Sequence, residues 1–328
     1  MTAKRTVLFM LVVAGLASGA MTLPGRARHY PSRPVTLVVP FAPGGSIDIV
    51  GRMLGEQLSS HLGQPFVIEN RPGGGTNIAT AGVARAAPDG HTLLITTSSL
   101  AINASLYKKL TYDPLNDLAP VALVADIPLV LVVNPSLPAR SAADLVALSK
   151  EQPGRLSYAS GGSGSAPHLF GELFKSMAGI EMTHVPYRGG SQAVTDVVAG
   201  HVQVMFADPG SVLPQMRDGK VRALGITSST RLPAIPDVPP IAEAGVAGFD
   251  AVSWQLVVAP AKTPPEIINR LHAAIKNIPV QADIEMRFTK LGLIPVASPP
   301  PEALRRFLAL EVERWGKVVR RIGIAGSE

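Results

Sequence analysis

Four segments of the chain share one pattern, in which a β-prone apolar run stops at a cluster of glycines and a helical pattern follows. The apolar runs cover residues 35–41, 66–70, 157–160 and 182–187, and the glycine clusters after them cover residues 44–46, 73–76, 161–165 and 189–191. Glycine at such a turn indicates backbone at positive φ. Because each strand passes directly into a helix, the pattern constrains the chain to an α/β fold.

The same turns have a chemical consequence. The first N–H groups of a helix have no partner within the helix, and they lie at the positive end of its dipole, so glycine there lets an anion approach the backbone. Two of the turns lie in the first third of the chain and two near its middle. We therefore expect two lobes, each contributing a pair of anion-binding turns to one cleft.

Strand and helix patterns alternate from Tyr30 onward, which favours a mainly parallel sheet with helices on both faces. We expect Ser46 to cap the first helix, with Asp48 in its favourable first turn. Further helical patterns cover residues 141–150, 265–278, 282–291 and 301–322.

Two runs, the fully apolar residues 129–133 and the largely apolar residues 255–259, are each followed closely by a proline. A complete α/β unit lies between them, so we expect these runs to be the strands that cross between the lobes. This divides the chain into a discontinuous first lobe, residues 30–127 and 254–328, and a second lobe, residues 128–253. With 328 residues, 46% of them apolar, the chain is long enough to bury a core in each lobe.

The N-terminus is typical of a secretory signal peptide. Lys4 and Arg5 precede a short apolar run and a group of small residues, and cleavage is expected after Ala20 or Ala27. The apolar run is shorter than the roughly 20 residues that a membrane-spanning helix needs. We therefore assign residues 1–27 to a signal peptide and expect an exported, periplasmic protein. The chain has no cysteine, so no lipid anchor is expected at the cleavage site.

Composition limits the partners. The net charge is +6, and +4 once Lys4 and Arg5 are removed, but no run of five basic residues occurs and aromatic residues make up only 5%. This favours small acidic solutes over nucleic acid. The seven histidines show no H-x-x-x-H spacing, so we expect neither a metal nor a cofactor.

Several side chains near the turns are candidates for ligand contact. His168 follows the third turn, and Arg188 precedes Gly189 and Gly190 of the fourth, where its guanidinium suits a carboxylate. Asp48 faces the same expected cleft, although a role beside the helix dipole explains it equally well. Ser163 and Ser165 invite a serine-hydrolase interpretation, but neither has the glycine at both minus two and plus two that a nucleophile elbow requires.

Five motifs, in this order, resemble the extracytoplasmic solute receptors of the tripartite tricarboxylate transporter family, also called Bug proteins. They are Pro43 to Asp48 after the first apolar run, Glu69-Asn70-Arg71-Pro72-Gly73, Pro88-Asp89-Gly90-His91-Thr92-Leu93, His184 to Gly190, and Pro236-Asp237-Val238-Pro239 with Glu243-Ala244-Gly245. The resemblance extends over essentially the whole mature chain. It implies a periplasmic-binding-protein fold of the type II-like, two-lobed and two-crossover kind, with the ligand held between the lobes.

The resemblance also implies which residues bind. Members of this family hold small carboxylates, from di- and tricarboxylates to amino acids and aromatic acids, through backbone amides and hydroxyls of the glycine turns. Transferred to this chain, the binding residues are Gly44, Gly45, Ser46 and Asn77 in the first lobe, and Ser160, Ser163, Tyr187, Gly189 and Gly190 toward the second. Ile47 departs from the family, which usually has a small hydroxyl residue there.

We therefore expect a monomeric, non-enzymatic receptor that delivers a small carboxylate to the large and small membrane subunits of a tripartite permease. Two alternatives stay open. One is an exported α/β hydrolase or transferase that uses a serine of residues 160–165. The other is a periplasmic sensor that reports the ligand to a signalling partner.

Overall fold

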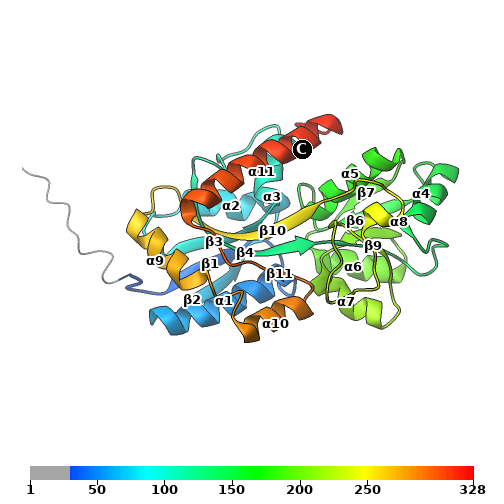
Figure 1. Ribbon diagram of the computed structural model, residues 1–328. Helices are drawn as coiled ribbons and strands as arrows, with labels where there is room; N and C mark the ends of the chain where they lie inside the picture. The colour runs from blue at the N-terminus through cyan, green and yellow to red at the C-terminus, as the bar shows by residue number, and fades with distance from the viewer. Residues whose placement is uncertain (1–29) are drawn as a thin grey trace, which may run out of the picture.

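The computed structural model describes residues 30–328, so the predicted signal peptide lies outside the described residues. Two lobes lie side by side, and the long strands β4 and β10 run from the first toward the second (Figure 1). The first lobe is built on a sheet of six strands and the second on a sheet of five. The lobes are thus two α/β units, as the sequence pattern predicts.

The first sheet has the order β11-β4-β10-β3-β1-β2. Its strands are β1 (Val35–Val39), β2 (Phe66–Asn70), β3 (Thr92–Thr97), β4 (Leu118–Pro128), β10 (Val252–Pro260) and β11 (Ile294–Pro295). Its helices are α1 (Ser46–Leu62), α2 (Asn77–Ala84), α3 (Ser99–Leu106), α9 (Pro265–Ile275), α10 (Ala282–Lys290) and α11 (Pro301–Arg321), and the short 3-10 helix η2 covers Gly74–Thr76. Helices α2, α3 and α11 lie on one face and α1 on the other (Figure 1).

The second sheet has the order β7-β6-β8-β5-β9. Its strands are β5 (Val130–Val133), β6 (Ser157–Ser160), β7 (Thr183–Pro186), β8 (Val204–Ala207) and β9 (Arg222–Ile226). Its helices are α4 (Ala142–Glu151), α5 (Ala166–Ala178), α6 (Gly190–Ala199), α7 (Pro209–Arg217) and α8 (Ile241–Ala244). Between β4 and β5 only Leu129 separates the two sheets, and the return passage is made just before Val252.

Both sheets are mixed, which corrects the expectation of a mainly parallel sheet. The strands that precede the glycine turns pair in parallel, β1 with β2 and β3, and β6 with β7 and β8. The strands at the crossing pair antiparallel: β10 with β3 and β4, and β5 with β8 and β9. Strands that carry the chain away from a lobe and back must run in opposite directions, which an apolar run of residues does not reveal.

A single hydrophobic core continues from the first lobe into one face of the second sheet. Trp315 on α11 stacks on Phe170 of α5, with ring centroids 5.4 Å apart, so a helix of the first lobe covers part of the second. Glu311 accepts hydrogen bonds from the indole N–H groups of Trp315, at 3.0 Å, and Trp254, at 2.8 Å. Among residues 30–328, no helix is both long and apolar enough to cross a membrane.

Candidate functional site

A cavity lies between the lobes where the first turn of the first sheet meets three helix starts of the second. It leaves about 90 Å³ for the centres of water-sized molecules, and a single water needs roughly 10–15 Å³ by that measure, so it suits a small solute. Its walls are formed by Phe41, Ala42, Gly45, Ser46, Ile47, Thr97, Ile127, Leu129, Gly161, Ser165, Ala166, Pro167, Gly190, Ser191, Met205, Asp208, Ser211 and Ser253.

The turn between β1 and α1 forms the first-lobe wall. Gly44 has the positive φ expected of the turn, +91°, whereas Gly45 is extended, with φ −81° and ψ 168°. Gly45 caps α1 and Ser46 is the first helical residue, which corrects the prediction that Ser46 is the cap. The Ser46 hydroxyl donates instead to the Asp208 carboxylate across the cleft, at 2.5 Å. No side chain caps α1, so the first N–H groups of this helix stay free of a side-chain acceptor.

Asp48 is predicted as a candidate ligand contact, but its oxygens are already used inside the first lobe. It accepts two hydrogen bonds from Arg52, at 3.0 and 3.1 Å, one from the Gly44 N–H at 3.0 Å and one from the Asn70 amide at 2.9 Å. Burial works to raise the pKa of Asp48, but the Arg52, Gly44 and Asn70 hydrogen bonds outweigh it and lower the pKa. Asp48 therefore fixes the shape of the glycine turn and does not line the cavity.

Two of the three helix starts on the second-lobe wall belong to α5 and α6. Ser165 precedes α5, and Gly189 precedes α6, whose first residues are Gly190 and Ser191. Neither helix has a side-chain cap. Gly161, Ser165, Gly190 and Ser191 line the cavity. Together with α1, three uncapped helix N-termini border one small space, which favours negative charge there.

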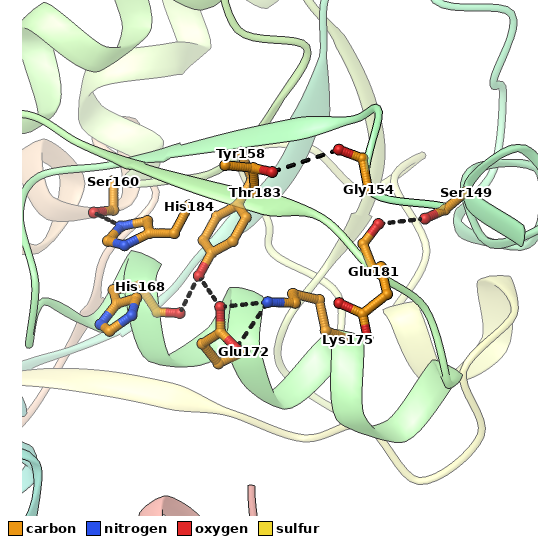
Figure 2. Close-up of polar contacts among 10 residues, drawn as sticks. All are labelled: Ser149, Gly154, Tyr158, Ser160, His168, Glu172, Lys175, Glu181, Thr183 and His184. Carbon is orange, nitrogen blue, oxygen red and sulfur yellow. Dashed lines mark hydrogen bonds and ion pairs between the residues drawn. The ribbon is translucent and has the colours of Figure 1, made fainter. Parts of the chain in front are cut away.

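Two histidines hold the loop that carries Gly161 and Ser165. Figure 2 shows both rings and the contact between Ser160 and His184. The Ser160 hydroxyl lies 2.7 Å from Nε2 of His184, and Nδ1 of His168 accepts from the Gly164 N–H at 3.2 Å. The two imidazoles stack with centroids 4.1 Å apart. Burial lowers the pKa of both, that of His184 to about 3, so both rings are neutral at neutral pH, and the Gly164 contact needs His168 in that form.

This geometry gives Ser160 and His168 a role beneath the site. Ser160 is completely buried and His168 is buried, and neither lines the cavity. A serine nucleophile has to reach its substrate, and Ser160 has no exposed surface. The Ser160–His184 pair therefore positions the glycine loop, and it gives no support to the hydrolase alternative.

The remaining predicted residues lie around the cavity and do not line it. The side-chain Oδ1 of Asn77 accepts from Asn103 and Tyr112 in the first lobe, at 2.9 and 2.7 Å. Tyr187 donates to Asp196 at 2.6 Å. The other three are Ser163, whose backbone oxygen faces Tyr107 of the first lobe, the exposed Arg188, and the buried Gly189.

The second glycine turn also stays outside the cavity wall. A Cβ atom on Gly75 would lie 2.1 Å from the Ser163 backbone oxygen, so this turn makes a close contact with the opposite lobe. With Ser46 bonded to Asp208, this contact places the two lobes against each other at two points of the rim. The cavity is thus bordered by one glycine turn of the first lobe and two of the second, and not by two from each.

Asp208 is the ionisable residue on the cavity wall, and it is not among the residues that the sequence predicts. It directly follows β8 and caps α7, where its Oδ1 accepts from the Gly210 N–H at 2.9 Å. The signal was available, since an aspartate followed by Pro209 marks a helix start. The glycine pattern does not indicate this turn, because it lacks the glycine cluster of the other four. Within the described part of the chain, no group of three His, Cys, Asp or Glu side chains is placed to hold a metal ion.

Comparison with known proteins agrees with this architecture. A family model described as the tripartite tricarboxylate transporter family receptor matches residues 50–324. The BugT protein of Bordetella pertussis, strain Tohama I, is 40% identical over 318 residues, which cover 96% of this chain and 97% of that protein. The motif resemblance found in the sequence is therefore confirmed.

Solved structures show the same fold. The R. palustris protein Rpa4515 with adipate is 38% identical, with a TM-score of 0.87 over 90% of this chain and 99% of that one. MatC from Rhodopseudomonas palustris with bound malate is 36% identical, with a TM-score of 0.84 over 88% of this chain and 100% of that one. The periplasmic binding protein BugD is 32% identical, with a TM-score of 0.86, covering 90% and 99% of the two chains.

The two-lobed architecture, the cavity between the lobes, the family match over most of the chain and these similarities lead to one assignment. The chain belongs to the tripartite tricarboxylate transporter receptor family, whose members are periplasmic solute-binding receptors and not enzymes.

Proposed function

We propose that this receptor binds a small carboxylate between its two lobes and delivers it to the membrane subunits of a tripartite permease. The observation that carries the proposal is the set of three uncapped helix N-termini, α1, α5 and α6, around one small cavity. No lysine or arginine is among the cavity residues, so the backbone N–H groups and the helix dipoles are left to bind the anion.

The relatives support this class of ligand, since Rpa4515 was solved with adipate and MatC with malate. In the binding mode we propose, Gly45, Ser46 and Gly190 contact the ligand directly. Gly44, Asp48, Ser160, His168 and Gly189 hold the turns that present them, and Asn77, Ser163, Tyr187 and Arg188 lie in the surroundings. Gly161, Ser165 and Ser191 complete the contact surface.

The lobes that close on the ligand are residues 30–127 with 254–328, and residues 128–253. This division is supported by sheet membership, which changes between Pro128 and Val130 and again before Val252. Release of the ligand then requires the contacts between Ser46 and Asp208, and between Gly75 and Ser163, to separate.

The proposal includes export and a monomeric state. The full-length chain expressed in a Gram-negative host should be recovered from the periplasm with a mass that corresponds to cleavage after Ala20 or Ala27. Recovery at full mass in the membrane fraction would contradict cleavage. The family description favours transport over sensing. A transport role predicts that deletion of the permease subunits abolishes uptake of the ligand, while the purified receptor still binds it.

Binding itself is tested with adipate and malate against their diamides, by isothermal calorimetry on the purified protein. A helix dipole and backbone N–H groups favour a carboxylate over a neutral amide, so at least one acid should bind with one-to-one stoichiometry and its diamide should not. If a wider series of small carboxylates fails to bind while neutral solutes do, the proposed function is wrong. Unchanged ligand recovered after incubation separates a receptor from an enzyme.

A further inference from the structure

The cavity has one ionisable side chain on its wall, and that side chain is acidic. Asp208 lies among otherwise apolar, hydroxyl and glycine residues, at the end of β8 in the second lobe. One of its oxygens accepts from the Gly210 N–H at 2.9 Å and the other from the Ser46 hydroxyl at 2.5 Å. An acid is an unexpected wall residue in a site for anions.

The charge on Asp208 is not compensated by a cation. In the portion of the chain from residue 30 onward, no lysine, arginine or histidine forms an ion pair or hydrogen bond with it. Asp48 provides the contrast, since Arg52 neutralises it and its pKa falls. Burial instead raises the pKa of Asp208, despite the hydrogen bonds that its carboxylate accepts from Ser46 and Gly210. A buried carboxylate without a cation is costly unless something else pairs with it.

Asp208 also has unused capacity to accept hydrogen bonds. An ionised carboxylate offers about four lone-pair positions, and the protein side chains and backbone N–H groups occupy two of them. Because Asp208 lies on the cavity wall, a ligand in the cavity can reach the remaining positions. A ligand that presents an apolar group to them would remove water from the acid and give nothing in return.

The helix capped by Asp208 also indicates where a ligand carboxylate can bind. Four helices of the two lobes begin beside the cavity, and α7 is the one whose N-terminus is already occupied by a protein carboxylate. The other three are available to a carboxylate of the ligand. A second ionised carboxylate placed against Asp208 would meet a like charge in a desolvated site, which raises the pKa of one of the two.

We propose that the ligand carries, in addition to its carboxylate, a hydrogen-bond donor that binds Asp208, either a hydroxyl or an ammonium group. This inference rests on the proposed function and narrows its ligand class to hydroxy acids and amino acids. Asp208 then acts as a specificity-determining residue. It rejects unsubstituted diacids of the same length, and the donor on the ligand replaces the water that the acid loses.

The test measures the Kd of a matched series of acids for the purified wild-type protein, by isothermal calorimetry at pH 7.5. Succinate, malate and aspartate share one carbon skeleton. Succinate carries no donor beside its carboxylates, malate carries a hydroxyl and aspartate carries an ammonium group. Adipate and 2-aminoadipate repeat the comparison at a longer length. Within the length that fits, the donor-bearing acid should bind about tenfold tighter or more, as expected for a hydrogen bond to a charged group. Malate and aspartate together distinguish hydroxyl from ammonium.

The variant Asp208→Asn tests the residue itself. Asparagine is an equally good helix cap, so α7 should form and the protein should fold. The preference for donor-bearing acids should shrink to within about threefold, because the charged acceptor is gone. Asp218→Asn is the matched control, since it removes the same charge from the exposed opposite end of α7, and it should leave the preference unchanged.

The outcomes separate this inference from the proposed function. Equal binding of substituted and unsubstituted acids, or an undiminished preference in Asp208→Asn, overturns the inference while carboxylate binding stands. Tightest binding of the unsubstituted diacid, strengthening from pH 8 to pH 5, also overturns it, because Asp208 then shares a proton with the ligand carboxyl. If no carboxylate of a broad series binds to the wild type, the proposed function and this inference both fail.

Discussion

Replacing Gly190 with valine should abolish ligand binding while leaving the fold intact. Gly190 is the first residue of α6 and lines the cavity, and a Cβ atom added there has no neighbour within 4 Å. Its φ lies outside the positive range, so a β-branched side chain is not strained there. The three added carbon atoms therefore enter the space that the ligand needs. The same substitution at Gly44, with φ +91°, would instead strain the turn.

The size of the effect follows from linkage. A ligand at a hundredfold excess over Kd stabilises the native protein by about 2.7 kcal/mol. For a chain somewhat longer than 250 residues, roughly 2 °C of Tm correspond to each kcal/mol, so the wild type should gain about 5 °C. Gly190→Val should show almost none of this gain. Without ligand its Tm should stay within about 1 °C of the wild type, since an unstrained substitution whose Cβ meets no neighbour costs little.

The assay is a thermal melt with and without the best carboxylate found by calorimetry. Ala282→Val is the matched control, because it places valine at the exposed first residue of α10, away from the cavity, and should keep the full ligand shift. A full ligand shift in a cooperatively folded Gly190→Val protein would refute the reasoning, since the start of α6 would then not border the bound ligand.

Three further predictions concern polar groups that do not line the cavity. Glu311→Leu leaves the indole N–H groups of Trp254 and Trp315 without an acceptor and should lower the free energy of unfolding in urea by about 2–5 kcal/mol. Glu311→Gln keeps a carbonyl acceptor and should lower it less. Equal stabilities of the two variants would contradict this. Burial lowers the pKa of His184 to about 3, below its unfolded value, so its stabilising contribution is complete above pH 7 and is lost as the pH falls toward 3. The Tm of His184→Gln should therefore fall less between pH 7 and pH 4 than the Tm of the wild type. Parallel curves of Tm against pH would contradict this. Burial, with the charge of Glu311, raises the pKa of Asp126 to about 6, so ionisation of Asp126 destabilises the fold as the pH rises through 6. Asp126→Asn should therefore raise the Tm more at pH 8 than at pH 4. A larger gain at pH 4 would count against this reasoning.

The features that the sequence predicts well are the local ones. A glycine cluster between an apolar run and a helical pattern is contained in about ten residues, so all four strand-to-helix turns are found where the sequence indicates them. The helix expected over residues 301–322 is observed at Pro301–Arg321 for the same reason, since its periodicity and its starting proline lie within the segment itself.

The features that the sequence does not predict depend on contacts between distant segments. Ser46 looks like a helix cap until Asp208, 162 residues away, takes its hydroxyl. Ser160 looks like a ligand contact until the parallel pairing of β6 with β7 brings Tyr158 opposite His184, whose ring then reaches the Ser160 hydroxyl. Which polar side chains face the cavity and which face the protein is decided by such pairings, and no local pattern records them.

Lobe closure can be tested with an introduced disulfide, because the chain has no cysteine that could compete for the bond. Ala42 lies in the first lobe and Gly189 in the second, and a Cβ atom built on Gly189 lies 3.4 Å from the Ala42 Cβ. Disulfides have Cβ–Cβ distances of about 3.5–4.5 Å, so Ala42→Cys with Gly189→Cys should form a bond across the cleft with little backbone movement. The extended φ of Gly189, 173°, accepts a side chain.

If the lobes must separate for the ligand to enter, the oxidised double variant should bind carboxylate at least a hundredfold more slowly than the reduced form, in stopped-flow measurements of intrinsic tryptophan fluorescence. Ligand trapped by oxidation in its presence should survive dialysis and be released by dithiothreitol. Each single cysteine variant should exchange ligand at a rate that does not change with the redox state. A disulfide that forms quantitatively, as read by intact mass, and yet leaves the exchange rate unchanged would mean that the ligand reaches the cavity without opening of the lobes, and the clamshell mechanism inferred from the contacts at the rim would be wrong.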